Sequence, residues 1–415
     1  MIHFSEFTLS NGLQVLVHPD PTVQVAVLNI LYKVGSRDEH SEKTGFAHLF
    51  EHLMFGGSAN VPNYDEPLQA VGGENNAFTS PDITNYYLTV PHENIETGFW
   101  LESDRMLSLS FDPNVLEVQR NVVIEEFNQR YLNQPYGDTW LKLRPLVYTK
   151  HPYQWATIGK DPEHIRKASM EDVKDFFFRF YRPDNAVLVV AGNVTIEQIK
   201  GLAEKWFGPI PSGNIVRNKL QMEDYGSGLK FSEVKARVPA DAFYMTYLMP
   251  GRFDKDYYAT DLLSDVLGRG DSSRLFNKLV KEKEIFTSIS SYVTGSLDPG
   301  LLVISGRLRE NFSLEQGHEE VSKIVNELVS KGLTEIELDK VKNLSLSTLE
   351  FDELEVLNRG MNLAFSSLSG DANLVNKERD IISGITSDQL VEQANKILNE
   401  KNSAIMYYRK ITEGV

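Results

Sequence analysis

The sequence contains no cysteine among its 415 residues. This absence excludes disulfide bonds, thiolate metal ligands and cysteine nucleophiles, and it leaves the redox environment undecided. The sequence also has no apolar run long enough for a membrane span, and no basic segment followed by an apolar core at its start. We therefore expect a cytoplasmic protein without a membrane span. A periplasmic or organellar location is the alternative, if a targeting segment was removed.

Positive charge is scarce. Lys and Arg number 42 against 58 Asp and Glu, which gives a net charge of -16. This excess of negative charge argues against a nucleic-acid partner. It is compatible with basic ligands, although a solubility charge spread over the surface is the simpler explanation. The length, with 41% apolar and 24% charged residues, predicts a globular protein of two or three domains.

The chain contains an internal echo of itself. Residues 169–185 and 386–402, which lie 217 positions apart, each predict a capped helix followed by a short break, and an apolar strand follows each of them. A second echo repeats Phe-Thr-Ser at 78–80 and 286–288, with an offset of 208. Two echoes with similar offsets predict a duplicated domain.

A stretch rich in Gly, Pro and Ser, residues 207–228, divides the chain near its middle and predicts a linker. We expect domains at 1–206 and 229–415. Strand-like runs and amphipathic helices follow one another without regular βαβ alternation, so the fold class predicted is α+β. Each of two homologous domains would be an antiparallel sheet with helices packed on one face. The segments concerned are strands at 13–17, 23–33 and 85–90, and helices at 95–109, 115–130 and 261–266.

The run TGFAHLFEHLMF, residues 44–55, predicts a helix that carries metal-binding side chains. His48 and His52 are four residues apart and would lie on one face, with Glu51 beside them. The spacing H-x-x-E-H is the inverse of a common zinc-hydrolase motif, and a carboxylate beside a metal-bound water can take its proton. The alternative is a chance polar cluster on a solvated helix. The apolar neighbours favour the metal site, because ionisable groups in such a setting need partners.

A third metal ligand is predicted on the helix of residues 112–130. Glu126 would lie inside the apolar stripe of this helix, Glu125 at its edge, and Glu117 on the opposite side. A glutamate on an apolar face is costly unless it is paired or metal-bound, so Glu126 is the best candidate. A buried salt bridge to an arginine is the alternative. The stripe is predicted from Val115, Leu116, Val122 and Val123.

These residues resemble the inverzincin zinc peptidases, which include pitrilysin, insulin-degrading enzyme and the mitochondrial processing peptidase. The resemblance implies one Zn²⁺ per chain at His48, His52 and Glu126, with Glu51 activating a zinc-bound water, and a second homologous domain without a zinc site. It covers nearly the whole chain, and its further segments follow in order: KVGSRDE (33–39), ENNAFTSPDITNYY (74–87), LESDRM (101–106), YRPDNAVLVVAGNV (181–194) and GRGDSSRLF (268–276).

The sequence departs from the family pattern at three positions. Gln119 stands where the family often has a glutamate that supports the site from behind its ligands; it can orient a ligand by hydrogen bonding but supplies no charge. Val280 and Thr287 stand where self-sufficient members have an arginine and a tyrosine that hold the peptide and its developing oxyanion. Arg274 and Tyr292 lie nearby at other positions of the pattern. We therefore expect a heterodimer, in which a homologous partner subunit supplies Arg and Tyr.

The segment ENNAFTSPDITNYYLTV resembles the edge strand of the family, to which substrate adds as a further strand. Asn76, Ala77 and Phe78 would then offer main-chain groups to an extended peptide. An ordinary hairpin strand is the alternative, since Pro81-Asp82 is a good turn signal.

The function expected is that of a zinc-dependent endopeptidase subunit. The alternative from another class is a non-catalytic structural or peptide-binding subunit of the same fold, although such subunits tend to lose the zinc motif and this chain retains it. A metallohydrolase that acts on small molecules is a third interpretation, and it would need a pocket too narrow for peptide.

Overall fold

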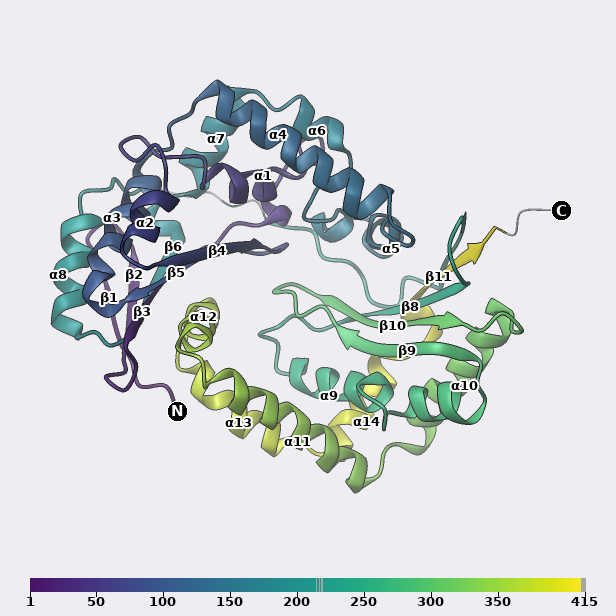
Figure 1. The fold of residues 1–415 in the computed structure, drawn as a ribbon. Coiled ribbons are helices and arrows are strands. Elements are labelled where there is room, and N and C mark those ends of the chain that lie inside the picture. The colour runs from purple at the N-terminus through teal and green to yellow at the C-terminus, as the bar shows by residue number, and fades with distance from the viewer. Residues whose placement is uncertain (214, 216, 218, 412–415) are drawn as a thin grey trace. The chain divides into compact units, whose positions relative to one another are not determined.

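The computed structural model describes residues 1–213, 215, 217 and 219–411 (Figure 1). Three positions of the expected linker, 214, 216 and 218, lie outside the described residues. The chain forms two compact units, each assembled from three segments, so the linear division at 207–228 stays a prediction about homologous domains. The first unit comprises Met1–Gln129, Trp155–Lys219 and Glu350–Glu378, and the second comprises Arg130–Gln154, Leu220–Leu349 and Arg379–Val415.

The first unit is built on a six-stranded sheet of order β1-β2-β6-β3-β5-β4. All its strand pairs are antiparallel except β2 with β6, which is parallel. Strand β6 is apolar and buried throughout, as a central strand should be. The strands are β1 (Ser5–Thr8), β2 (Gln14–Pro19), β3 (Val25–Tyr32), β4 (Glu74–Thr79), β5 (Thr84–Pro91) and β6 (Ala186–Gly192).

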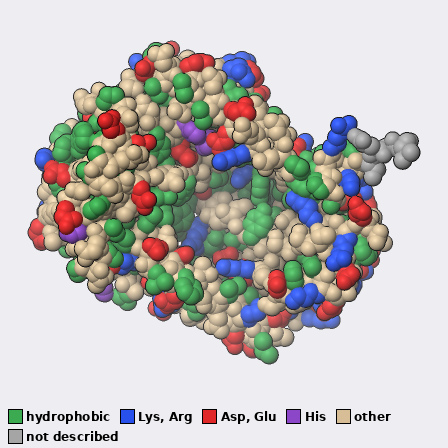
Figure 2. Space-filling model, in the orientation of Figure 1, with side chains coloured by type: hydrophobic (Ala, Val, Ile, Leu, Met, Phe, Trp, Pro, Cys, Tyr) green, Lys and Arg blue, Asp and Glu red, His purple; other side chains and the backbone are tan. Residues whose placement is uncertain are grey.

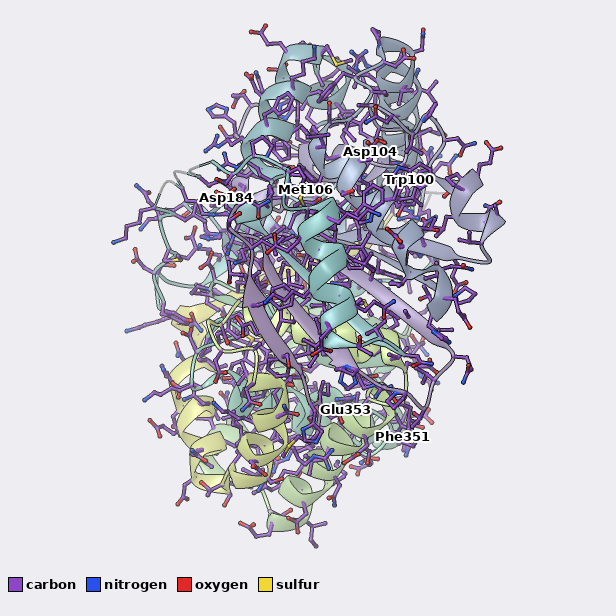
Figure 3. All side chains as sticks on the ribbon, turned by 90° about the vertical axis from the view of Figure 1, so that its left-hand side faces the viewer. Trp100, Asp104, Met106, Asp184, Phe351 and Glu353 are labelled. Carbon is purple, nitrogen blue, oxygen red and sulfur yellow. The ribbon has the colours of Figure 1, made fainter. Side chains whose placement is uncertain are left out.

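Helices cover both faces of this sheet. Gly98 of α3 lies against Leu28, whereas Gly360 of α12 lies against Val27. Because neighbouring residues of a strand point to opposite faces, α3 and α12 pack on opposite sides. Figure 3 labels Trp100, Asp104 and Met106 of α3. The helices of this unit are α1 (Phe46–Leu53), α2 (Asp65–Ala70), α3 (Ile95–Leu107), α4 (Pro113–Phe127), α6 (Pro162–Arg166), α7 (Met170–Phe180), α8 (Ile196–Trp206) and α12 (Val356–Ser367).

The second unit is built on a five-stranded sheet of order β7-β11-β8-β10-β9. Again all pairs are antiparallel except one, β7 with β11. Helices α9, α10 and α14 share one core with one face of the sheet, and α5 packs on the other face. The strands are β7 (Lys230–Ala236), β8 (Ala242–Met249), β9 (Phe286–Val293), β10 (Gly300–Leu308) and β11 (Ser403–Lys410). The helices are α5 (Thr139–Val147), α9 (Tyr257–Gly268), α10 (Leu314–Lys331) and α14 (Ser387–Ile397), while α11 (Glu335–Asp352) and α13 (Leu374–Gly384) contain residues of both units.

The two sheets share one topology. Strand β7 takes the place of β2, β11 of β6, β8 of β3, β10 of β5 and β9 of β4, and the single parallel pair is the same. Both α7 and α14 begin with a capping box, at Ser169 and Thr386. Asn185 donates to the carbonyl of Phe180 at 2.8 Å, and Asn402, its counterpart in the first sequence echo, donates to that of Ile397 at 3.0 Å. The expected α+β fold with two related halves is confirmed.

The second sequence echo is out of register. Residues 78–80 lie at the hairpin end of β4, whereas 286–288 begin β9. The strand pairings instead make Ala77 equivalent to Ser291, and hence Phe78 to Tyr292. This equivalence follows from the cross-strand partners, which run Ala77–Tyr86–Ile30–Leu188 in the first sheet and Ser291–Ile304–Met245–Ile405 in the second. The last residues of the two series, Leu188 and Ile405, are separated by the same number of residues as the two segments of the first echo.

Each sheet carries on its second face a helix from the other half of the sequence. Helix α12 packs on β6 and β3 of the first sheet, and α5 packs on β7 and β11 of the second. The two helices begin at Thr139 and Val356, which again have the separation of the first echo. The expectation of helices on one face therefore describes the helices local to each sheet, and the exchanged helices cover the other face.

The distribution of charge agrees with the simpler explanation of the acidic composition. Asp and Glu side chains are scattered over the visible face, interspersed with Lys and Arg (Figure 2). Among the described residues, no helix is both long and apolar enough to cross a membrane.

Candidate active site

The site begins with the way helix α1 starts. Gly45 precedes the helix with φ of 89°, and a Cβ there would lie 2.6 Å from the carbonyl oxygen of Ile158, so glycine is required on both counts. The carboxylate of Glu39 accepts the N–H groups of Gly45 and Ala47 at 2.9 and 2.8 Å. Burial raises the pKa of Glu39 well above its usual range, and these two N–H groups act in the opposite direction. Glu39 ends the segment 33–39 that resembles the family, but it is not among the predicted site residues.

The apolar side of α1 fixes which side chains are left for chemistry. Phe50 is fully buried and stacks on Phe176 and Tyr181, with ring centroids 4.9 and 5.1 Å apart. The hydroxyl of Tyr86 donates to the carbonyl of Phe50 at 3.3 Å. This packing fixes the rotation of α1 about its own axis and leaves the side chains of His48 and His52 only partly buried.

Helix α4 presents the third residue. Asp112 caps it by accepting the N–H of Asn114 at 2.7 Å, and Pro113 occupies its first turn. The apolar stripe differs from the predicted one at a single member, Val122. Val122 is 43% exposed, and the buried residues are Leu116, Val123, Ile124 and Phe127. Val122 was wrongly placed in the stripe because apolar type alone does not exclude exposure, since much of the surface of a folded protein is apolar.

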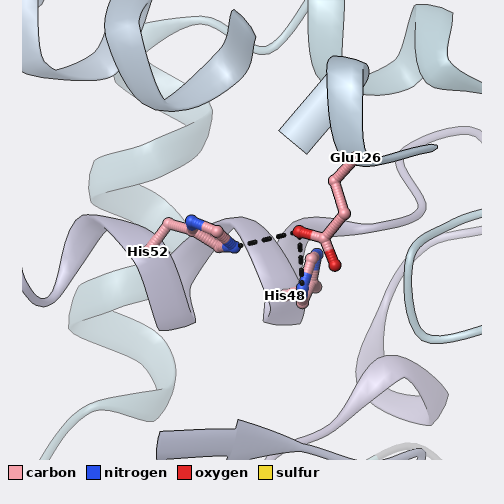
Figure 4. Close-up of side chains that lie close together, drawn as sticks. All are labelled: His48, His52 and Glu126. Carbon is pink, nitrogen blue, oxygen red and sulfur yellow. Dashed lines mark ion pairs between the residues drawn. The ribbon is translucent and has the colours of Figure 1, made fainter. Parts of the chain in front are cut away.

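His48, His52 and Glu126 come together from α1 and α4 (Figure 4). The Nε2 atoms of His48 and His52 lie 3.7 and 3.5 Å from Oε2 of Glu126. One ligand atom from each residue can be chosen so that all lie within 4.8 Å of one another, and it is the one such cluster of three or more His, Asp or Glu found among the described residues. Two tetrahedral ligand atoms with bonds of about 2.1 Å would be about 3.4 Å apart, so two imidazoles and a carboxylate at these distances fit Zn²⁺.

Neighbouring acids are placed differently. Oε2 of Glu51 accepts a hydrogen bond from the hydroxyl of Thr79 at 2.6 Å, which ties α1 to the end of β4. Glu125 is exposed, and its Oε1 accepts from the side-chain amide of Gln129 at 2.9 Å, outside the cluster. Gln119, about two turns before Glu126 on the same helix, is partly buried. Thr79 was not singled out by sequence reasoning, since a strand threonine carries no signal of its own.

Strand β4 forms one edge of the first sheet. Along it Asn76 and Phe78 are exposed, while Ala77 is half-buried between them. The side-chain oxygen of Asn76 accepts the N–H of Ala77 at 2.8 Å, and Phe78 is 42% exposed. A tight turn with Asp82 at its centre joins β4 to β5, so the strand is both a hairpin strand and an open edge.

The two positions in the second half that depart from the family pattern, and the Arg and Tyr near them in sequence, make contacts within the second unit. Val280 packs against the apolar core of the second unit, and the hydroxyl of Thr287 donates to the carbonyl of Arg307 at 3.1 Å. Arg274 is held by Glu337 through two hydrogen bonds of 2.7 and 2.9 Å. Tyr292 is 39% exposed on β9, and burial of its hydroxyl end raises its pKa to about 12.

Known proteins resemble this chain in sequence and fold. Residues 14–136 match the family described as insulinase (peptidase family M16), and residues 167–345 match the peptidase M16 inactive domain. The zinc protease PqqE of Helicobacter pylori is 31% identical over 341 residues, 81% of this chain and 77% of that protein. The uncharacterized zinc protease YmxG of Bacillus subtilis is 27% identical, over 90% of this chain and 93% of that protein.

Solved structures extend the likeness. The crystal structure of a protease from Helicobacter pylori has a TM-score of 0.93 and 27% identity, covering 99% of this chain and 100% of that one. Pitrilysin, at 18% identity and a TM-score of 0.79, shares the fold over 98% of this chain and 45% of its own length. With two family models in sequence along the chain and a zinc protease 31% identical, the chain belongs to the insulinase family of peptidases, family M16.

Proposed function

We propose that this chain is the catalytic subunit of a zinc-dependent endopeptidase. His48, His52 and Glu126 would bind one Zn²⁺, and Glu51 would be the general base. The observation that carries the proposal is the convergence of two imidazoles and a carboxylate within 4.8 Å, next to a further carboxylate on the same helix. When bound, Zn²⁺ polarises the scissile carbonyl and makes the attacking water more acidic.

The chain's own residues supply the remaining steps. Glu51 accepts a proton from the attacking water and returns it to the leaving amine. Main-chain groups of Asn76, Ala77 and Phe78 on the open edge of β4 would pair with an extended peptide, so that recognition reads backbone and tolerates many side chains.

A partner subunit is part of the proposal. Amide hydrolysis develops a negative oxygen that needs hydrogen-bond donors besides the metal. Val280 has an apolar side chain, and the hydroxyl of Thr287 already donates to a main-chain carbonyl. A homologous subunit would therefore contribute an arginine and a tyrosine in a heterodimer. The cytoplasmic location stays a prediction.

The test compares Glu51→Gln with Glu125→Gln. Both changes remove one carboxylate charge, but only the first removes the proposed base. With bound zinc retained, Glu51→Gln should lower hydrolysis of a fluorogenic peptide by about a hundredfold or more, while Glu125→Gln should remain near wild type. Turnover should be low for the chain alone and rise when the partner is added.

Two results would contradict the proposal. Near-wild-type turnover by Glu51→Gln would remove the general base. Purified protein that takes up no zinc, and hydrolyses no peptide with or without a related partner, would favour the non-catalytic subunit instead.

A further inference from the structure

The last residue of strand β4 contacts the proposed base. The hydroxyl of Thr79 donates to Oε2 of Glu51 at 2.6 Å, the short distance expected when the acceptor is a carboxylate. Side chains alternate along a strand, so Thr79 points to the α1 side of the sheet while exposed Phe78 points to the other. Two consecutive residues of β4 therefore have different roles: Phe78 belongs to the edge proposed to bind the peptide, and Thr79 contacts the proposed base.

Thr79 is itself held firmly. It pairs with Thr84 at the start of β5, directly before the turn that ends β4. In that turn Ser80 donates its N–H to the carbonyl of Ile83 at 2.8 Å, and its hydroxyl accepts the N–H groups of Asp82 and Ile83 at 3.1 and 3.0 Å. Asp82 is buried and paired with Arg37 at 2.9 Å. These contacts hold the end of the hairpin in place, and with it the hydroxyl of Thr79.

From this geometry we infer that Thr79 is a positioning residue for the base: it fixes the Glu51 carboxylate relative to the strand that receives the peptide. The inference rests on the proposed function. A glutamate side chain has three rotatable bonds, and one hydrogen bond to Oε2 removes most of that freedom while Oε1 stays available for water. Threonine suits the task because its hydroxyl can donate one hydrogen bond to the carboxylate without placing a countercharge beside it.

One consequence follows for substrate register. A peptide added along Asn76 to Phe78 takes its position from the main chain of β4, and Glu51 takes its position from Thr79 of the same strand. The hydrogen bond from Thr79 therefore links the Glu51 carboxylate of α1 to the strand that positions the scissile bond, and a small misplacement of a catalytic group is costly. Loss of the Thr79 hydroxyl should therefore lower kcat and leave KM unchanged.

The experiment uses Thr79→Val, which keeps the β-branched shape and removes the donor, and Thr79→Ser, which keeps the donor. Thr8→Val is the matched control, the same change at an exposed position on the opposite edge strand of the sheet. Each is loaded with zinc and assayed on a fluorogenic peptide, together with the partner subunit if turnover needs it. Thr79→Val should lose about 10- to 100-fold in kcat, the range found when hydrogen-bond partners behind the ligands of a metal site are removed. Its KM and zinc content should match wild type, and Thr79→Ser should recover most of the loss.

Two further measurements separate this role from a structural one. In a Glu51→Gln background, Thr79→Val should cause no additional loss, because both changes act through one carboxylate. Crystal structures of the zinc-loaded variants decide the matter without turnover: the Glu51 carboxylate should move from its place in Thr79→Val and stay in Thr79→Ser. An unmoved carboxylate in Thr79→Val, a kcat within about twofold of wild type, or losses that multiply in the double variant would each overturn the inference. Normal turnover by Glu51→Gln alone would instead overturn the proposed function on which it rests.

Discussion

Removal of the buried arginine beneath the site should destabilise the first unit severely. The side chains of Arg105 and Glu102 are 1% and 0% exposed, and two hydrogen bonds of 2.7 and 2.6 Å join them. The hydroxyl of Tyr64 also donates to Glu102, at 2.6 Å. Arg105→Met would leave the carboxylate buried without its countercharge, which costs about 3–5 kcal/mol in comparable cases.

A second contribution comes from the aromatic rings around the guanidinium. Cζ of Arg105 lies 4.4 Å from the ring centre of Tyr86 and 4.6 Å from that of Tyr64. Such cation–π contacts are worth about 2 kcal/mol when they are desolvated. Met fills much of the space of Arg, so its packing should offset part of these two losses. We therefore expect the free energy of unfolding to fall by about 4 kcal/mol in total.

Urea unfolding followed by circular dichroism measures this loss. Arg166→Met is the matched control: Arg166 pairs with Glu163 at the same i,i+3 spacing and the same 2.7 Å distance, but their side chains are 54% and 47% exposed. That variant should lose at most about 0.5 kcal/mol. The double change Arg105→Met with Glu102→Leu should restore much of the stability, since it leaves no unpaired charge.

The site should respond as well, because Tyr86 packs on Arg105 and donates to the carbonyl of Phe50 in α1. Arg105→Met should therefore weaken zinc retention under mild urea, before global unfolding. Equal stability losses for Arg105→Met and Arg166→Met would refute the reasoning from burial. Strict additivity in the double variant would refute the account of an unpaired charge.

Two further predictions concern the metal and pH. Glu126→Ala should lower bound zinc and Glu125→Ala should not, as measured by metal analysis of the purified variants; the reverse result would shift the ligand by one residue. Burial, and then Asp261, raises the pKa of Asp265 to about 6. A raised carboxyl pKa stabilises the fold fully below about pH 4 and loses that contribution as pH rises through 6. Asp265→Asn should thus gain up to about 3 kcal/mol relative to wild type between pH 4 and 7, seen in urea titrations at both pH values. Asp339→Asn is the control, the same change at an exposed position. A gain independent of pH would contradict the argument.

The features that the sequence predicted well depend on local chemistry. A capping box, and an asparagine whose side chain binds a carbonyl at the end of the preceding helix, both depend on contacts within a few residues. The similarity between 169–185 and 386–402 therefore predicted the repeated structure correctly. The H-x-x-E-H spacing is likewise local to one turn of helix. Glu126 required only that α4 pack against α1, and the structure places it beside both histidines.

The features that the sequence left open depend on long-range packing. Amphipathicity shows that α5 and α12 each have an apolar side, but it does not say which sheet that side meets, so the exchange of these helices was not foreseen. The parallel strand pairs β2–β6 and β7–β11 were not predicted for the same reason, because strands that pair across a long stretch of sequence leave no local sequence pattern. Thr79 and Glu39 act through α1 only after folding brings them there.

The repeat also bears on why the two halves differ in chemistry. In the second unit α9 occupies the place of α1: α9 follows β8 along the chain, as α1 follows the equivalent strand β3, and the strand register aligns Ile30 with Met245. When the two helices are aligned with that same offset, their last residues coincide, and His48, Glu51 and His52 correspond to Leu263, Val266 and Leu267. All three of the latter are at most 1% exposed and belong to the apolar core. The same helix position therefore carries polar side chains in the first unit and packing in the second. A duplicated helix can give up its site in this way because apolar side chains at those positions add burial, whereas imidazoles without a metal would cost desolvation.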